Sequence, residues 1–155
     1  MTNTTLLLLR RNNEILLAMK KRKFGKDKWN GVGGKLELDE TIKQAMIRET
    51  KEEICVTPTN YEKMAEITFL EYVNDKQEQV NMHVFIATEW QGEPTETEEM
   101  APRWFDIDKL PYDNMFPDDK FWLPKVIDGQ KIKAFFKFDE KWNMVSQNIE
   151  EVDDF

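Results

Sequence analysis

The stretch from residue 42 to residue 56 constrains this chain most, because a helix there would have a face that starts apolar and ends acidic. At roughly 100° per residue, one stripe of that helix contains Ile42, Ala45, Met46, Glu49 and Glu53. Glu52 lies beside the stripe, so Glu49, Glu52 and Glu53 are neighbours on the helix surface. Such an acidic face is either solvated, with nearby basic side chains as partners, or it binds a cation.

Grouped carboxylates repel one another, and burying them is costly without a compensating positive charge. A hard divalent cation such as Mg²⁺ supplies that charge, because it takes oxygen ligands and completes its shell with water and substrate phosphates. The coincidence of the carboxylates with the apolar stripe therefore favours a metal site. Arg48 lies four residues before Glu52, where it can orient a carboxylate.

The residues around this helix predict how it begins. Thr41 and Gln44 have the spacing of a capping box. Upstream lie Gly33, Gly34 and, six residues past Gly34, Glu40. A glycine turn that runs into a helix lets the backbone approach phosphates and a bound metal, although a tight turn between strand and helix explains the same pair.

Apolar patterning along the rest of the chain predicts an α/β fold, with a mixed sheet covered on both faces. We expect one domain over residues 1–155, whose acidic tail after about residue 148 is frayed. A polar loop is predicted at 74–79. The predicted strands are 5–9, 14–19, 61–73, 80–90, 102–106 and 131–138, and the predicted helices are 41–54 and 116–127.

Composition excludes several classes of function. The formal net charge of −8 argues against a protein that holds a nucleic acid polymer, which needs a cationic surface. Cys55 is the single cysteine, so no disulfide forms within the chain and a reducing compartment is expected. No apolar run has the length of a membrane span. We therefore expect a cytoplasmic protein, without a membrane or nucleic acid partner, that acts on a small molecule.

The stretch 34–56 resembles the Nudix box, G-x5-E-x7-R-E-U-x-E-E-x-G-U, in which U is a bulky aliphatic residue. The matching positions are Gly34, Glu40, Arg48, Glu49, Glu52, Glu53 and Val56. Thr50 stands where an aliphatic residue is usual, which should weaken packing rather than chemistry. Cys55 stands where glycine is usual, so the helix lacks its usual glycine C-cap.

Further segments resemble the MutT-homologue branch of this family, which sanitises oxidised purine nucleoside triphosphates. They are 19–22, 24–25, 29–35, 83–85, 98–100, 104–105, 116–119 and 135–138. The resemblance implies the Nudix fold, an α/β/α sandwich with a central mixed β-sheet, and hydrolysis to a nucleoside monophosphate and pyrophosphate. It also implies Mg²⁺, with Mn²⁺ as a substitute, and a small-molecule nucleotide as the bound partner. We expect a monomer.

The resemblance assigns the catalytic groups by position. Glu49, Glu52, Glu53, Glu99 and the Gly33 carbonyl would hold the metal, and Arg48 would support them. Glu52, Glu53 or Glu99 would accept the proton from water, and the sequence does not decide among them.

By the same resemblance, Asn30, Asp118 and Asp119 would read the base while Phe116 stacks on it. The remaining pocket positions would be Thr5, Lys20, Phe24, Gly33, Gly34, Lys35, Phe69 and Val80. If one of the two adjacent acids is neutral it donates while the other accepts, so the pair can read different purine edges. The acids also suit the start of a helix.

Phe116 departs from the tryptophan that is usual in this branch, and its smaller ring offers less stacking area. Two alternatives to an oxidised purine therefore remain. One is hydrolysis of another nucleoside diphosphate derivative, such as a nucleotide sugar, a dinucleoside polyphosphate or a methylated purine nucleotide. The other is a non-catalytic domain that binds a nucleotide.

Overall fold

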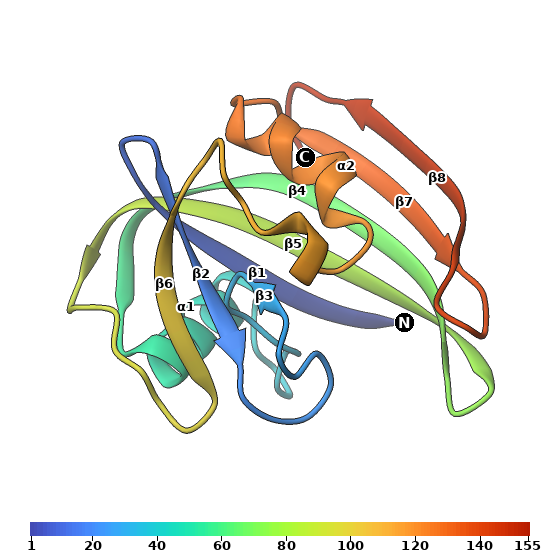
Figure 1. Cartoon of the computed structure of the whole chain (residues 1–155), viewed down its shortest axis with the longest axis horizontal. Helices are drawn as coiled ribbons and strands as arrows, with labels where there is room; N and C mark the ends of the chain where they lie inside the picture. The colour runs from blue at the N-terminus through green and yellow to red at the C-terminus, as the bar shows by residue number, and fades with distance from the viewer.

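A twisted mixed β-sheet runs through the computed structural model, which describes residues 1–155 (Figure 1). Its strand order is β3-β2-β1-β5-β4-β7-β8, and β6 pairs with β2. The pairs β1·β5 and β4·β7 are parallel and the other pairs are antiparallel, so the predicted mixed sheet is confirmed. The elements are β1 (Thr2–Arg11), β2 (Glu14–Lys20), β3 (Trp29–Asn30), α1 (Ile42–Ile54), β4 (Thr57–Val73), β5 (Lys76–Gln91), β6 (Met100–Asp106), η1 (Tyr112–Asn114), α2 (Asp119–Ile127), β7 (Ile132–Phe138) and β8 (Met144–Glu151).

Strand β1 shows why the sheet needs a helix on each face. Leu6 and Leu8 lie in a core shared with α2, whereas Leu7 and Leu9 lie in a second core shared with α1. A strand that is buried on both faces has an unbroken apolar run. The run of four leucines is therefore the centre of the predicted α/β/α sandwich. None of the helices is both long and apolar enough to cross a lipid bilayer.

Helix α1 begins with the capping box that the sequence predicts. The Gln44 backbone N–H donates to Thr41 Oγ1 at 3.1 Å, and the Thr41 N–H donates to Gln44 Oε1 at 2.9 Å. Thr50 is fully buried, and its hydroxyl donates to the Met46 carbonyl oxygen at 2.8 Å. The hydroxyl at this usually aliphatic position is thus satisfied within the helix.

The end of α1 adopts a conformation that favours glycine. Cys55 has a φ of 64°, in the left-handed region, and its N–H donates to the Lys51 carbonyl oxygen at 3.0 Å. A residue with a Cβ is strained there, whereas glycine is not. The end of α1 therefore has the backbone conformation of a glycine C-cap, although the residue in that position is cysteine.

Several sequence predictions are wrong in their bounds, and strands β1, β4, β5 and β6 each begin before the predicted residue. The predicted loop 74–79 is a tight turn at Asn74 and Asp75, both with positive φ, because residues 76–79 extend β5. Helix α2 begins at Asp119 rather than at residue 116. The tail is not frayed after residue 148, since β8 reaches Glu151 and pairs there with Ile132 of β7.

We expect the Cys55→Gly variant to be more stable than the parent protein. Glycine relieves the left-handed strain, and this gain of ~1 kcal/mol corresponds to an increase in Tm of about 2–4 °C for a domain of this size. Thermal unfolding followed by circular dichroism measures the change. Cys55→Ala is the matched control, because it removes the exposed thiol but keeps the Cβ. An equal increase in both variants would assign the effect to the thiol instead.

Candidate active site

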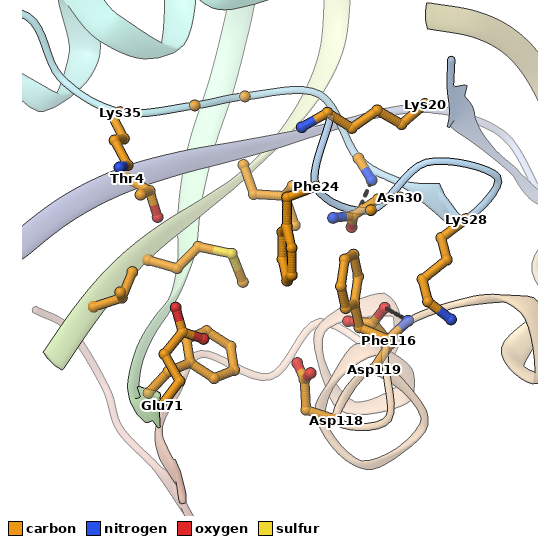
Figure 2. A pocket seen from close by; sticks show the side chains of 18 of the residues that line it. Thr4, Lys20, Phe24, Lys28, Asn30, Lys35, Glu71, Phe116, Asp118 and Asp119 are labelled. Atoms are coloured by element: carbon orange, nitrogen blue, oxygen red, sulfur yellow. Dashed lines mark hydrogen bonds between the residues drawn. The ribbon is translucent and has the colours of Figure 1, made fainter. Parts of the chain in front are cut away.

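A cavity of about 500 Å³ opens on the face of the sheet that α2 covers (Figure 2). Its floor consists of alternate residues from neighbouring strands, which is the period of side chains that share one sheet face. Every pocket position that the sequence predicts lines this cavity. These positions are Thr5, Lys20, Phe24, Asn30, Gly33, Gly34, Lys35, Phe69, Val80, Phe116, Asp118 and Asp119.

Two adjacent carboxyl groups are buried at one end of the cavity. Asp118 Oδ2 accepts a hydrogen bond from Trp122 Nε1 at 2.8 Å, and Asp119 Oδ2 accepts one from the Phe116 N–H at 3.1 Å. Burial raises the pKa of Asp118, and burial together with the charge of Asp118 raises the pKa of Asp119 well above its usual value. Two negative charges in this position are therefore disfavoured, and a proton held by Asp119 gives the pair one donor and one acceptor.

The helix-start interpretation of these acids is only partly correct. Asp118 occupies the N-cap position of α2, but its side chain makes no capping hydrogen bond. Its carboxylate is instead used by the indole of Trp122, one turn into the helix. One hydrogen bond from a nearby residue thus holds each carboxyl group. The other oxygen of each group remains able to contact a ligand in the cavity.

Asn30 and the aromatic rings complete this end of the cavity. Asn30 Oδ1 accepts a hydrogen bond from the Gly31 N–H at 2.9 Å, which leaves Nδ2 as a donor. The rings of Phe24 and Phe116 stack with centroids 5.7 Å apart and planes inclined by 28°. Rings this close already touch each other, so a base stacks against one of them rather than between them. Gly25 has a positive φ, and a Cβ there would lie 3.0 Å from the Phe116 ring.

The glycine loop runs from strand β3 to helix α1 and lies beside strand β1. The Thr5 N–H donates to the Gly34 carbonyl oxygen at 2.9 Å, so the loop lies beside β1. A Cβ on Gly33 would lie 1.9 Å from the Thr5 carbonyl oxygen, and one on Gly34 would lie 2.7 Å from Glu49 Oε1. No other residue type fits at either position without moving the backbone or the glutamate. Thr5 Oγ1 is also buried here without a hydrogen-bond partner.

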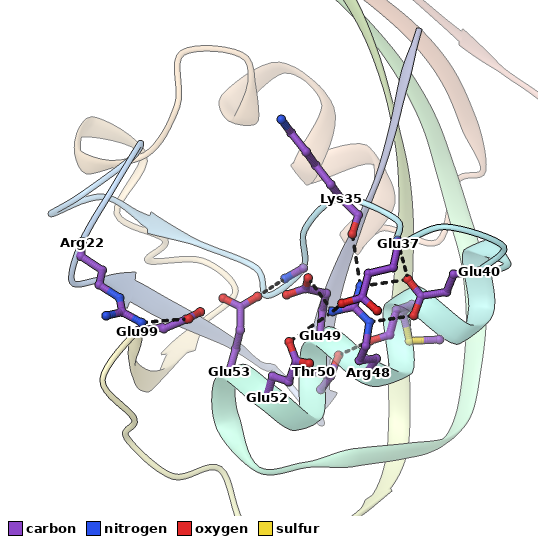
Figure 3. Close-up of polar contacts among 12 residues, drawn as sticks. Arg22, Lys35, Glu37, Glu40, Arg48, Glu49, Thr50, Glu52, Glu53 and Glu99 are labelled. Carbon is purple, nitrogen blue, oxygen red and sulfur yellow. Dashed lines mark hydrogen bonds and ion pairs between the residues drawn. The ribbon is translucent and has the colours of Figure 1, made fainter.

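Arg48 holds the carboxylates at the start of the acidic face (Figure 3). It donates two hydrogen bonds to Glu40, from Nε at 2.7 Å and from Nη2 at 2.9 Å. Its Nη1 donates to Glu49 Oε1 at 3.0 Å and to Glu52 Oε2 at 3.2 Å. The hydrogen bonds from Arg48, followed by one from the Glu37 N–H, lower the pKa of Glu40 to about 2. One guanidinium thus orients three carboxylates of the box.

Glu53 lies deeper than the other acids of the helix. It is 3 % exposed, and its Oε1 accepts a hydrogen bond from the Gly33 N–H at 2.8 Å. Burial raises its pKa to about 8, and the negative charges of Glu49 and Glu99 contribute to the increase. Glu99 arrives from the loop before β6 and pairs with Arg22, with Nη2 and Oε1 at 3.1 Å.

The donor set fits a hard divalent cation, although the carboxylates do not converge on one point. No three acidic, histidine or cysteine side chains lie close enough together to hold a metal ion. Glu49 and Glu52 turn toward Arg48, and Glu99 turns toward Arg22. Glu53, however, has one carboxylate oxygen without a hydrogen bond from the protein, among other negative charges. A bound cation would relieve this conflict at Glu53.

Several lining residues were missed from the sequence. Phe69 was identified, and the period of two along β4 would have added Glu71 and Val73 on the same face. Lys28 lies with its Nζ 5.8 Å from the centroid of the Phe116 ring. Trp142 follows β7 in a turn before the unpredicted strand β8, so no sequence signal placed it beside Phe24, with ring centroids 5.3 Å apart.

We expect Asp119→Asn to stabilise the protein at neutral pH. The folded-state pKa of Asp119 lies above the unfolded value near 3.8. The contribution of the carboxyl to stability is therefore fully present below pH ~4 and is lost as the pH rises through the folded pKa. Asparagine still accepts the Phe116 N–H and can donate to Asp118. A gain of ~1 kcal/mol, or about 2–4 °C in Tm, should appear at pH 7 and vanish near pH 3.5.

Asp153→Asn is the control, since it removes a carboxylate from an exposed position outside the helices and strands. Its effect should not grow between pH 3.5 and pH 7. An Asp119→Asn variant whose Tm difference is independent of pH would contradict the raised pKa. Thermal unfolding at several pH values measures both variants.

Comparison with known proteins places this arrangement in a family. The sequence pattern of the NUDIX domain matches residues 1–126. The chain is 41 % identical over 150 residues to the oxidized purine nucleoside triphosphate hydrolase of Danio rerio, covering 97 % of this chain and 95 % of that protein. It is 39 % identical to the protein of the same name from Mus musculus, covering 97 % and 96 % of the two chains.

The fold is also found among solved structures. The mutator MutT protein of Bacillus halodurans superimposes with a TM-score of 0.83 over 97 % of this chain and 98 % of that chain, at 23 % identity. The MutT NUDIX hydrolase of Burkholderia pseudomallei gives a TM-score of 0.64 at 26 % identity, over 71 % of this chain and 86 % of that chain. With its box residues gathered beside a nucleotide-sized cavity and these matches over most of its length, the chain belongs to the Nudix family.

Proposed function

We propose that this protein hydrolyses oxidised purine nucleoside triphosphates, such as 8-oxo-dGTP and 2-hydroxy-dATP, to the nucleoside monophosphate and pyrophosphate. The observation that carries the proposal is the buried pair Asp118 and Asp119 in a cavity that opens beside the box glutamates. Relatives at about 40 % identity named oxidized purine nucleoside triphosphate hydrolase support the same substrate class.

The base end of the cavity suits a purine whose edge pattern is altered by oxidation. Asn30 offers a donor, and the acid pair offers one donor and one acceptor when it holds a single proton. Moving that proton between Asp118 and Asp119 changes which edge they match. One pocket can therefore accept an oxidised guanine and an oxidised adenine, while Phe116 stacks on the base.

The phosphate end is built from the glycine loop and helix α1. Lys20 and Lys35 line the cavity and attract the triphosphate to an otherwise acidic protein. Glu49, Glu52, Glu53 and Glu99 would hold Mg²⁺, or Mn²⁺ as a substitute, with the Gly33 carbonyl near it. When bound, the ion neutralises phosphate charge and acidifies the attacking water.

The chain's own part in the chemistry is to position these groups and to take up a proton. Arg48 keeps Glu49 and Glu52 oriented, and the Gly33 N–H holds one oxygen of Glu53. A carboxylate oxygen of Glu52, Glu53 or Glu99 accepts the proton of the attacking water.

A second candidate keeps the chemistry and changes the substrate. Phe116 already packs against Phe24 and offers a smaller stacking face than tryptophan. This favours a less selective pocket, which would take a nucleotide sugar, a dinucleoside polyphosphate or a methylated purine nucleotide. A non-catalytic nucleotide-binding role has less support, since every box glutamate is retained.

Three expectations from the sequence stay predictions. They are a monomeric state, a location in the cytoplasm and the absence of a nucleic acid polymer as partner. Each is consistent with a small nucleotide as substrate.

The substrate class is tested by measuring kcat/KM for 8-oxo-dGTP, 2-hydroxy-dATP, dGTP and dATP side by side in Mg²⁺. We expect the oxidised purines to be preferred by at least tenfold, or ~1.4 kcal/mol of barrier. Glu53→Gln should lower every rate by roughly 100-fold or more, because it removes a charged ligand of the metal. Equal turnover of 8-oxo-dGTP and dGTP would leave Nudix chemistry standing and reject the sanitising function.

The role of Arg48 is tested separately with Arg48→Lys. Lysine keeps the charge but cannot make the two parallel hydrogen bonds to Glu40 while it holds Glu49. We expect kcat to fall roughly 10- to 100-fold, as for other residues that orient metal ligands. The Mg²⁺ concentration for half-maximal activity should rise, and KM for the nucleotide should change by less than about twofold.

Lys51→Ala removes a cation from the exposed side of the same helix and is the control. It should leave both kcat and the Mg²⁺ requirement near the wild-type values. A variant of Arg48 whose KM rises while kcat and the Mg²⁺ requirement stay constant would show that the guanidinium binds the substrate directly.

A further inference from the structure

Glu71 is a carboxylate in a position where the cavity floor is otherwise mainly apolar. It lies on β4 two residues after Phe69, and both side chains face the cavity. The neighbouring strand β5 contributes Val80 and Met82 to the same floor, and β1, which lies beyond β5, contributes Leu6. Figure 2 shows Glu71 pointing into the cavity from the side opposite Phe116, with Asp118 pointing in from the start of α2.

The surroundings of Glu71 disfavour its charge. Burial raises its pKa, and the negative charges of Glu78 and Asp118 raise it further, while Lys35 acts in the opposite direction. Glu78 is its cross-strand partner on β5, so two like charges lie directly opposite each other. No hydrogen bond from the protein stabilises the carboxylate. The half-buried group is therefore destabilising for the free protein, which is typical of a residue kept for a ligand.

The position of Glu71 defines what it can bind. In the proposed function the phosphates bind at the glycine loop and Lys20. Glu71 and Asp118 lie across the cavity from Lys20 (Figure 2), on the side that would hold the base. A carboxylate there repels phosphate and accepts hydrogen bonds from N–H groups. The donors that a purine offers at its edge are its exocyclic amino group and protonated ring nitrogens.

We propose that Glu71 accepts a hydrogen bond from the exocyclic amino group of the bound purine and is a third acidic specificity residue beside Asp118 and Asp119. This inference rests on the proposed function, because it assumes a purine nucleotide in the cavity. Glu71 would add a contact from strand β4 to the contacts that Asp118 and Asp119 would make from the start of α2. A base held from both sides is oriented in its plane as well as stacked.

The test compares 8-oxo-dGTP with 8-oxo-dITP, which lacks the 2-amino group. In Glu71→Leu, KM for 8-oxo-dGTP should rise roughly tenfold or more, the loss expected for a hydrogen bond to a charged acceptor. For 8-oxo-dITP, KM should change by less than about twofold, and kcat should stay near the wild-type value for both. Glu71→Gln keeps a neutral acceptor and should recover part of the loss.

Glu89→Gln is the control, since it removes the same charge from an exposed position of β5 that does not line the cavity. The change in KM that this control causes should be small and equal for the two substrates. Thermal unfolding completes the design, because Glu71→Leu should keep or raise the Tm when the carboxylate is destabilising. A loss of Tm, an equal loss of activity on both substrates or an unchanged KM would each overturn the inference.

The two proposals fail in different ways. If the wild-type protein turns over 8-oxo-dGTP and dGTP equally, the oxidised-purine function is rejected and the role of Glu71 with it. If the preference for 8-oxo-dGTP holds and Glu71→Leu affects the two substrates alike, only the role of Glu71 is rejected.

Discussion

The guanidinium of Arg48 makes the acidic face of α1 compatible with a folded protein. Glu40, Glu49 and Glu52 all accept hydrogen bonds from it, and without this cation three carboxylates would repel one another at the glycine loop. Glu53 is outside the reach of this network and stays buried with a single hydrogen bond from Gly33. The protein thus satisfies part of its negative charge internally and leaves the remainder, around Glu53, for a cation.

Carboxyl groups with incompletely compensated charge also lie at the other end of the cavity. Burial raises the pKa values of Asp118, Asp119 and Glu71, and the negative charge of Asp118 raises those of Asp119 and Glu71 further. Apolar side chains in these buried positions would make the folded protein more stable. Acids that the fold alone does not favour therefore lie at one end of the cavity and beside the glycine loop at the other. In the proposed function, a metal with phosphate is the partner of the acids beside the glycine loop, and the donor edge of a base is the partner of Asp118, Asp119 and Glu71.

Much of this site was readable from the sequence, because its signals are local. The capping box of Thr41, the spacing of the glutamates and the Gly33-Gly34 pair each act within one or two turns of chain. Strand β8 was missed since it is an edge strand whose side chains are mostly exposed, so it lacks hydrophobic alternation. Glu71 faces Glu78 because of the register between β4 and β5, and Trp142 reaches Phe24 because of the turn between β7 and β8. No short sequence motif encodes either feature.

The two ends of the site lie on opposite faces of the sheet, and the glycine loop connects them. The base end rests on the α2 side with Phe69 and Leu6, while α1 covers the side with Leu7 and Leu9. The loop lies against β1, where a Cβ on Gly33 would meet the Thr5 carbonyl oxygen and a Cβ on Gly34 would meet Glu49. The requirement for these glycines therefore follows from the packing of the loop between β1 and α1. In the proposed function the same lack of side chains lets the backbone approach the phosphates.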